Sequence, residues 1–126
     1  MLADHDAQAT VPVKDLTRAR TFYEQVLGLK PVAGDAQNGV QGYQSGKSSI
    51  VVYQSAFAGT NQATTVTFSV GGKFDEVMRE LKAKGVVFEH YDFPGVKLDG
   101  DVHVHGDSRV AWFKDPDGNI INLGNY

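Results

Sequence analysis

The pattern of hydrophobic and polar positions in this chain occurs twice. An extended run ending at Val13 precedes a helical pattern that stops at Gly28. A second run ending at Val70 precedes another helical pattern, which stops at Gly85, and both landmarks recur at an offset of 57 residues. The repeat predicts two similar modules, each with a strand, a helix and a small meander. Duplicated modules often enclose a ligand, so we expect a cleft lined by matching positions.

Local signals place the elements of the first module. A strand is expected over 7–13, and Asp15 follows it as the N-cap of a helix that ends at Gly28. The apolar residues of this helix share one stripe: Leu16, Ala19, Phe22, Tyr23, Val26 and Leu27. Short runs broken by glycine over 32–53 predict a meander, and the polar segment 57–63 reads as a bridge between the modules.

The second module repeats the order. Residues 65–70 alternate polar and apolar, as a half-buried strand does, and an amphipathic helix follows Gly71-Gly72. Two closing strands over 109–114 and 119–123 flank Asp115-Pro116-Asp117-Gly118, which predicts a tight hairpin. The Gly-, Asp- and His-rich segment 89–108 is too long for a simple turn, which favours a functional or mobile loop.

Composition narrows the classes of function. The 126 residues are 41% hydrophobic and 21% charged, which predicts one domain over 1–126 with a core of its own. A net charge of −3 and the lack of a Lys/Arg cluster argue against nucleic-acid and membrane-surface partners. The absence of cysteine excludes thiolate ligands. Because neither a signal peptide nor a membrane span is recognisable, we expect a cytoplasmic location.

Four segments together carry a family resemblance: 11–16 (VPVKDL), Phe22-Tyr23, 27–29 (LGL) and 111–121 (AWFKDPDGNII). In combination they resemble the vicinal oxygen chelate superfamily of glyoxalases, bleomycin resistance proteins and extradiol dioxygenases. The resemblance implies an α+β fold of two βαβββ modules, about 5–57 and 62–126, whose curved mixed sheets surround a cleft. It also implies a homodimer.

In metal-dependent members of this superfamily, His, Gln and Glu ligands come from the first and last strands of each module. The matching positions here are Gln8, Thr65, Asn122, and Val52 or, with the register moved by one, Tyr53. This set contains no imidazole and no carboxylate, the ligands that a divalent metal needs at such a site. We therefore expect no metal at the usual positions and no other cofactor.

The row Asp101, His103, His105 and Asp107 offers an alternative. On a strand these side chains would share one face, and two imidazoles with a carboxylate could hold a displaced divalent metal. The protein would then be a metal-dependent lyase, isomerase or dioxygenase. The competing interpretation is an exposed edge strand or loop. A metal-free enzyme with Asp101, Glu89 or His105 as general base is a third possibility.

The first hypothesis is a protein that binds a small organic molecule, aromatic or cationic, as bleomycin-resistance proteins sequester an antibiotic. Hydrogen bonds would come from Gln8, Tyr53, Thr65 and Asn122, and stacking surface from Tyr91, Phe93 and Trp112. Trp112 and Phe113 alternate on their strand, so only one of the two can face the ligand while the other packs against a helix.

Overall fold

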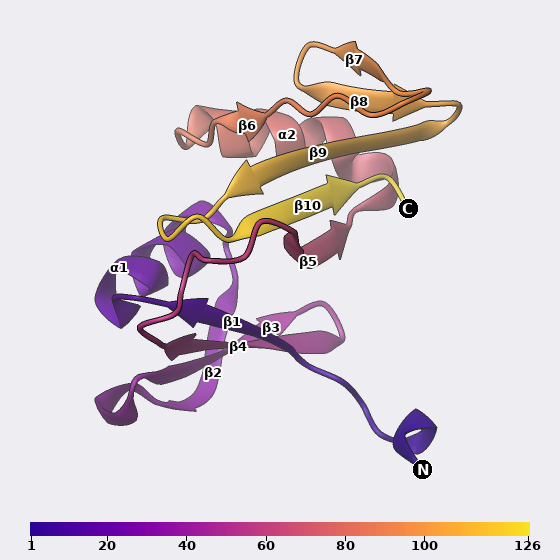
Figure 1. Ribbon diagram of the computed structural model, residues 1–126. Coiled ribbons are helices and arrows are strands. Elements are labelled where there is room, and N and C mark those ends of the chain that lie inside the picture. Colours follow the sequence, from indigo (N-terminus) through magenta and orange to yellow (C-terminus); the bar gives the residue numbers. More distant parts are fainter. The chain divides into compact units, whose positions relative to one another are not determined.

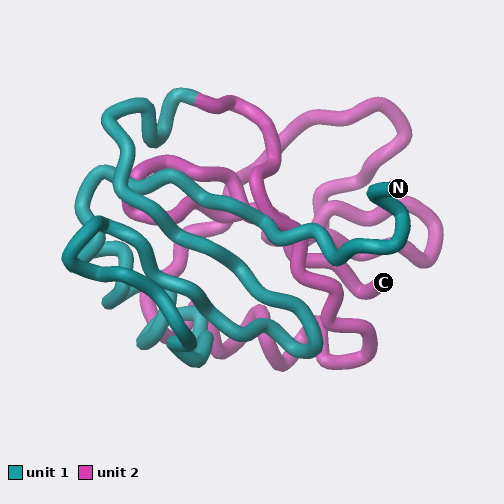
Figure 2. Tube along the Cα trace, turned by 90° about the horizontal axis from the view of Figure 1, so that it is seen from below, with its two compact units in different colours: residues 1–60 teal, residues 61–126 magenta.

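The computed structural model describes all residues from 1 to 126, and they form two compact units, Met1–Thr60 and Asn61–Tyr126 (Figure 2). Each unit combines one α-helix with one mixed sheet (Figure 1), which confirms the predicted α+β class. Neither α-helix is long and apolar enough to cross a membrane.

The first unit has the predicted βαβββ order. Its elements are β1 (Ala9–Val13), α1 (Leu16–Arg20), a π-helical segment (Thr21–Val26), β2 (Lys30–Asp35), β3 (Val40–Ser45) and β4 (Ser48–Gln54). The strands lie in the order β1-β4-β3-β2, with β1 parallel to β4 and the other neighbours antiparallel. Val11, Val13, Ile50 and Val52 are buried in the core of this unit, where α1 packs on β4.

The first helix begins and ends where the sequence predicts, but its second half is wound differently. The Asp15 carboxylate accepts the backbone N–H groups of Thr17 and Arg18 at 2.9 and 3.2 Å, which caps the helix. From Thr21 the helix widens, and the Leu27 N–H donates to the Phe22 carbonyl five residues earlier. Gly28 then leaves the helix with φ of 70°, a left-handed conformation that suits glycine.

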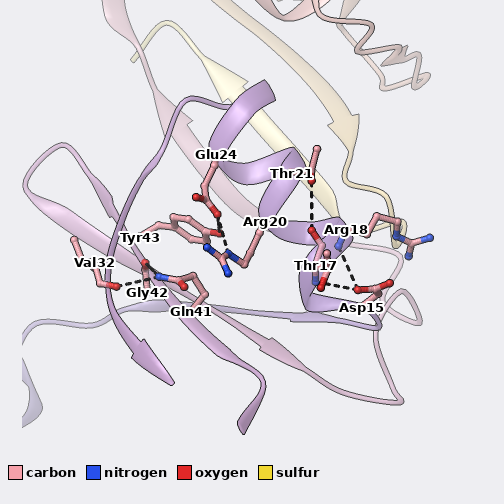
Figure 3. A network of polar contacts seen from close by, with 10 residues as sticks. All are labelled: Asp15, Thr17, Arg18, Arg20, Thr21, Glu24, Val32, Gln41, Gly42 and Tyr43. Atoms are coloured by element: carbon pink, nitrogen blue, oxygen red, sulfur yellow. Dashed lines mark hydrogen bonds and ion pairs between the residues drawn. The ribbon is translucent and has the colours of Figure 1, made fainter. Parts of the chain in front are cut away.

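A buried tyrosine joins this helix to the sheet. Tyr43 is fully buried and stacks on Tyr23, with ring centroids 6.0 Å apart. Its hydroxyl donates to Glu24 Oε2 at 2.9 Å, and Arg20 Nε donates to the same oxygen at 3.1 Å (Figure 3). Burial, followed by the hydrogen bond to Glu24, raises the pKa of the Tyr43 hydroxyl.

The second unit carries more strands than βαβββ requires. Its elements are β5 (Thr64–Ser69), α2 (Phe74–Ala83), β6 (Phe88–Glu89), β7 (Lys97–Asp99), β8 (Val102–His105), β9 (Ser108–Lys114) and β10 (Ile120–Gly124). The order is β5-β10-β9-β8-β7, with β5 parallel to β10 and β6 paired with β9. The extra strands β7 and β8 come from segment 89–108, which the sequence analysis assigned to a functional or mobile loop.

The turn between β9 and β10 is held by its first residue. The Asp115 side chain is buried, and its Oδ1 accepts the backbone N–H groups of Asp117 and Asn119 at 2.9 and 2.8 Å. Its Oδ2 accepts Asn119 Nδ2 at 2.7 Å. These bonds replace water for a buried carboxylate and fix the hairpin that the Asp-Pro-Asp-Gly sequence predicts.

The raised pKa of Tyr43 predicts a loss of stability at alkaline pH. A hydroxyl with a higher pKa in the folded state stabilises the fold fully below its unfolded pKa of about 10, and this contribution is lost as the pH rises further. Urea unfolding between pH 8 and 11.5 should therefore show a decline of up to about 1.4 kcal/mol per pH unit above pH 10. Tyr43→Phe should reduce this decline, whereas Tyr53→Phe, a half-exposed tyrosine on β4, serves as the control. An unchanged decline in Tyr43→Phe would contradict the prediction.

Candidate functional site

The sheet of the second unit presents two chemically different faces. On one face Arg109 reaches α2: its guanidinium lies 5.2 Å from the centre of the Phe74 ring and donates to Asp75 at 2.7 Å. Alternate residues of a strand point to opposite faces. Trp112 is three residues after Arg109 on the same strand, so its side chain lies on the opposite face, away from α2. Asn122 pairs with Trp112, and Thr67 pairs with Asn122, so both of these side chains lie on that face too. Thr65, two residues before Thr67, lies on this face as well.

Four rings gather on the face away from α2, and we call them the aromatic cluster: Tyr91, Phe93, His103 and Trp112. The Trp112 ring is the centre, with centroid distances of 4.8 Å to His103, 5.6 Å to Tyr91 and 5.5 Å to Phe93. Its Nε1 donates to Thr64 Oγ1 at 3.1 Å, which ties the indole to the first residue of β5. His103 comes from β8, and Tyr91 and Phe93 from the segment that follows β6.

Polar atoms without partners are buried in the same region. His103 is only 1% exposed; its Nε2 accepts the Tyr91 backbone N–H at 2.9 Å, but its Nδ1 has no partner. The hydroxyls of Tyr91 and Thr65 are also buried and unpaired. Burial, and then the charge of Glu89, raises the pKa of Tyr91. An unpaired buried polar group costs about 1–3 kcal/mol, so each of these atoms has a hydrogen-bonding capacity that the protein itself does not use.

Asn122 and the terminal tyrosine form a second feature of this face. Asn122 is 4% exposed; its Nδ2 donates to the Ala111 carbonyl at 3.1 Å, and its Oδ1 accepts the Tyr126 hydroxyl at 2.7 Å. The Tyr126 ring covers Gly124, where a Cβ atom would lie 2.3 Å from ring carbons. Only glycine permits this approach. This contact was not predicted from the sequence, although the i, i+2 spacing of Gly124 and Tyr126 at the end of a strand is a signal for it.

Two predicted ligand-binding residues lie in the other unit. Gln8 is exposed, donates to Ser49 Oγ, and lines a surface cavity of about 360 Å³ together with Asp6, Ala7, Lys47, Ser48 and Ser49. Tyr53 lies on β4, paired with Pro12 of β1, and is 36% exposed. The structure thus brings Thr65, Tyr91, Phe93, Trp112 and Asn122 to one face of the second sheet, and leaves Gln8 and Tyr53 in the first unit.

The pairing of the strands corrects one of the positions at which a metal ligand was expected. Val52 is fully buried in the core of the first unit, so it cannot serve as a ligand position on the face that carries Gln8. Asn122 pairs with Thr67; the residue 57 positions before Thr67 is Thr10, which pairs with Val51. Val51 is therefore the structural counterpart of Asn122, in place of Val52 or Tyr53.

The residues at the usual positions do not fit a divalent metal. Gln8, Val51, Thr65 and Asn122 contain neither an imidazole nor a carboxylate. The amide of Asn122 is already bonded to Ala111 and Tyr126. A metal site of this family would need several stronger donors.

The alternative row of histidines is not a metal-binding group either. His103 is buried, contrary to the interpretation as an exposed edge or loop, because β8 pairs with β9 and the aromatic cluster covers the ring; His105 is exposed. Asp101 instead pairs with His90 at 2.8 Å and with Lys82 at 3.2 Å, and the hydrogen bond from His90 is the main reason that the pKa of Asp101 is lowered. No three His, Asp or Glu side chains lie close enough to hold a metal ion.

The contact between Tyr126 and Gly124 predicts a coupling that a double-mutant cycle can measure. Tyr126→Phe removes the bond to Asn122 and should lower the free energy of unfolding by about 1 kcal/mol. In a Gly124→Ala background the ring is already displaced by the new Cβ, so the same change should cost almost nothing. Gly72→Ala, where a Cβ meets no atom within 4 Å, is the matched control. Equal costs in both backgrounds would show that the ring does not rest on Gly124 in solution.

Comparison with known proteins shows which family this fold belongs to. The family model described as Glyoxalase/Bleomycin resistance protein/Dioxygenase superfamily matches residues 7–123. No curated protein sequence is a significant match. Among solved structures, an integron cassette protein from the mobile metagenome of the Halifax Harbour sewage outfall has a TM-score of 0.72 at 18% identity, with 94% of this chain and 96% of that chain covered.

Two further solved structures are similar. The genomically encoded fosfomycin resistance protein FosX from Listeria monocytogenes has a TM-score of 0.70 at 17% identity, with 95% and 91% of the two chains covered. Lactoylglutathione lyase from Agrobacterium tumefaciens has a TM-score of 0.69 at 18% identity, with 95% and 92% covered. At these identities the structural likeness shows the shared fold, and the family model, which spans nearly the whole sequence, confirms the resemblance. The chain belongs to the glyoxalase/bleomycin resistance protein/dioxygenase superfamily.

Proposed function

We propose that this protein binds a small aromatic molecule, neutral or charged, on the face of the second sheet away from α2, without the help of a divalent metal. The observation that carries the proposal is the aromatic cluster with buried, unpaired polar atoms at His103, Tyr91 and Thr65. Apolar rings beside a few convergent polar groups are the usual composition of a small-molecule site.

The cluster is suited to stacking because its central ring is fixed before a ligand arrives. Trp112 is tied to Thr64 by its Nε1 and bordered by Tyr91 and His103, so little conformational freedom remains to be lost on binding. Phe93 is 42% exposed and forms the accessible rim. Each aromatic contact with a ligand would contribute about 0.5–1.5 kcal/mol beyond area burial, and a cation over the indole could contribute a similar amount.

The choice of binding over metal catalysis follows from the donor set. The fold alone hosts many activities. One solved FosX structure is a complex with Mn(II) and dihydroxypropylphosphonic acid, and another structural neighbour is named a lyase. In this chain the corresponding positions offer amides, a hydroxyl and an apolar side chain. The alternative, a metal-dependent lyase, isomerase or dioxygenase, would need donors at positions where this sequence has none, so we propose sequestration of the ligand, as in antibiotic resistance.

Homodimer formation and a cytoplasmic location remain part of the proposal. Both rest on the family resemblance and on the composition of the sequence. Sedimentation equilibrium of the purified protein would test the first, with a mass of twice 13.7 kDa as the expected result.

The only tryptophan of the chain is at the centre of the proposed site, so its fluorescence reports binding directly. Titration with small aromatic compounds, in the presence of EDTA, should change the Trp112 emission and raise the melting temperature. Phe93→Ala should weaken the affinity by about tenfold, because one stacking surface is lost. Phe57→Ala removes a phenylalanine that is 79% exposed in the other unit and should leave the affinity unchanged. Equal affinities of the two variants, or binding that requires added metal, would contradict the proposal.

A further inference from the structure

The two ring nitrogens of His103 have different hydrogen-bonding roles. Its Nε2 accepts the backbone N–H of Tyr91 at 2.9 Å. A ring nitrogen that accepts such a bond carries no proton, and a neutral imidazole has one proton to place. The proton of His103 is therefore on Nδ1, which makes this atom a hydrogen-bond donor. That donor is buried and has no partner in the protein.

Two carboxylates beside the strands of the aromatic cluster are already paired. Glu89 lies opposite Trp112 in the register of β6 and β9, on the face of the aromatic cluster. Its carboxylate already forms an ion pair with Lys114 Nζ at 3.1 Å. Asp101, near the same end of β8, is held by Lys82 and His90. The unpaired groups are thus the Nδ1–H of His103, which can only donate, and the hydroxyls of Tyr91 and Thr65, which can donate or accept.

We propose that the ligand is an aromatic compound with an oxygen acceptor on or next to its ring, a carbonyl or carboxylate, which accepts the hydrogen bond of His103 Nδ1. The ring stacks on Trp112 and the oxygen is directed toward His103, whose Nδ1–H a cationic head group cannot satisfy because it has no acceptor. This inference rests on the proposed function and narrows its class of ligand from any small aromatic molecule to one that carries an acceptor.

Selectivity follows from the cost of leaving the donor unpaired. A ligand that covers His103 without accepting from it keeps the desolvation penalty, whereas an acceptor removes it. Two probes of nearly the same size separate these cases: benzamide has a carbonyl acceptor, and benzylamine is a cation at pH 7 with no acceptor. We expect benzamide to bind at least tenfold more tightly than benzylamine.

Variants of His103 test the assignment. His103→Gln retains an acceptor for the Tyr91 N–H and a donor for the ligand, so the preference for benzamide should persist. His103→Leu removes both groups, and the preference should fall to about twofold or less through weaker benzamide binding. His105→Gln, at an exposed position of the same strand, should leave both affinities unchanged. Affinities come from Trp112 fluorescence, and thermal unfolding of each variant shows whether it is folded.

The results separate this inference from the proposed function. Binding of both probes with equal affinity, or a preference that survives His103→Leu, would overturn the inference and leave the proposed site intact. Absence of binding by either probe would overturn both.

A second measurement does not depend on variants or ligands. A long-range ¹H–¹⁵N spectrum of the wild-type protein should show the His103 proton on Nδ1 and an unprotonated Nε2. A proton on Nε2 would overturn the inference, because the buried donor would not exist.

Discussion

The pairing of β9 with its neighbours is the constraint on which the site depends. This strand pairs with β10 on one side and with β6 and β8 on the other, so its side chains are fixed in direction. Phe113 is 1% exposed and meets the Phe88 ring edge-on at 5.9 Å in the core, while its neighbour Trp112 points to the opposite face. Because neighbouring side chains of β9 point to opposite faces, Phe113 packs in the core of the second unit and Trp112 lies in the proposed binding site.

The same face also carries the position at which the family resemblance expects the last metal ligand. Asn122 stands at that position, and its amide is held by Ala111 and Tyr126. A neutral amide tied to a phenol stabilises the end of β10 without any ion. Of the usual ligand positions only Thr65 has a buried, unpaired polar atom, and the other unpaired atoms on this face belong to His103 and Tyr91 of the aromatic cluster.

Features that depend on local interactions could be predicted from the sequence. The cap at Asp15, the stop at Gly28 and the closing hairpin each depend on residues a few positions apart, and the structure has all three. The alternation of Trp112 and Phe113 predicted that one ring would be core and the other would not. Apolar periodicity and glycine positions predicted a strand, a helix and a meander in the first unit, and the family resemblance implied the βαβββ order that the structure has.

Features that depend on pairing between distant segments could not be predicted. Strands β7 and β8 are short and rich in polar residues, so their role in the sheet became apparent only from their pairing, and with it the burial of His103. The structural counterpart of Asn122 is Val51 and not the expected Val52. An error of one residue in the register places a side chain on the wrong face, and only the pairing reveals it. The bond between Tyr126 and Asn122 is local, and the spacing of Gly124 and Tyr126 is its one sequence signal, but only the structure shows the ring lying on the glycine.

The central claim is that the aromatic cluster binds an organic molecule without a metal, and the most direct test is a titration followed by ¹H–¹⁵N correlation spectra in EDTA. With benzamide as the probe, we predict shifts of the single indole resonance of Trp112 and of the backbone amides of Tyr91, Phe93 and His103, with the first unit largely unaffected. Shifts confined to other residues, or shifts that appear only after a divalent metal is added, would contradict the account.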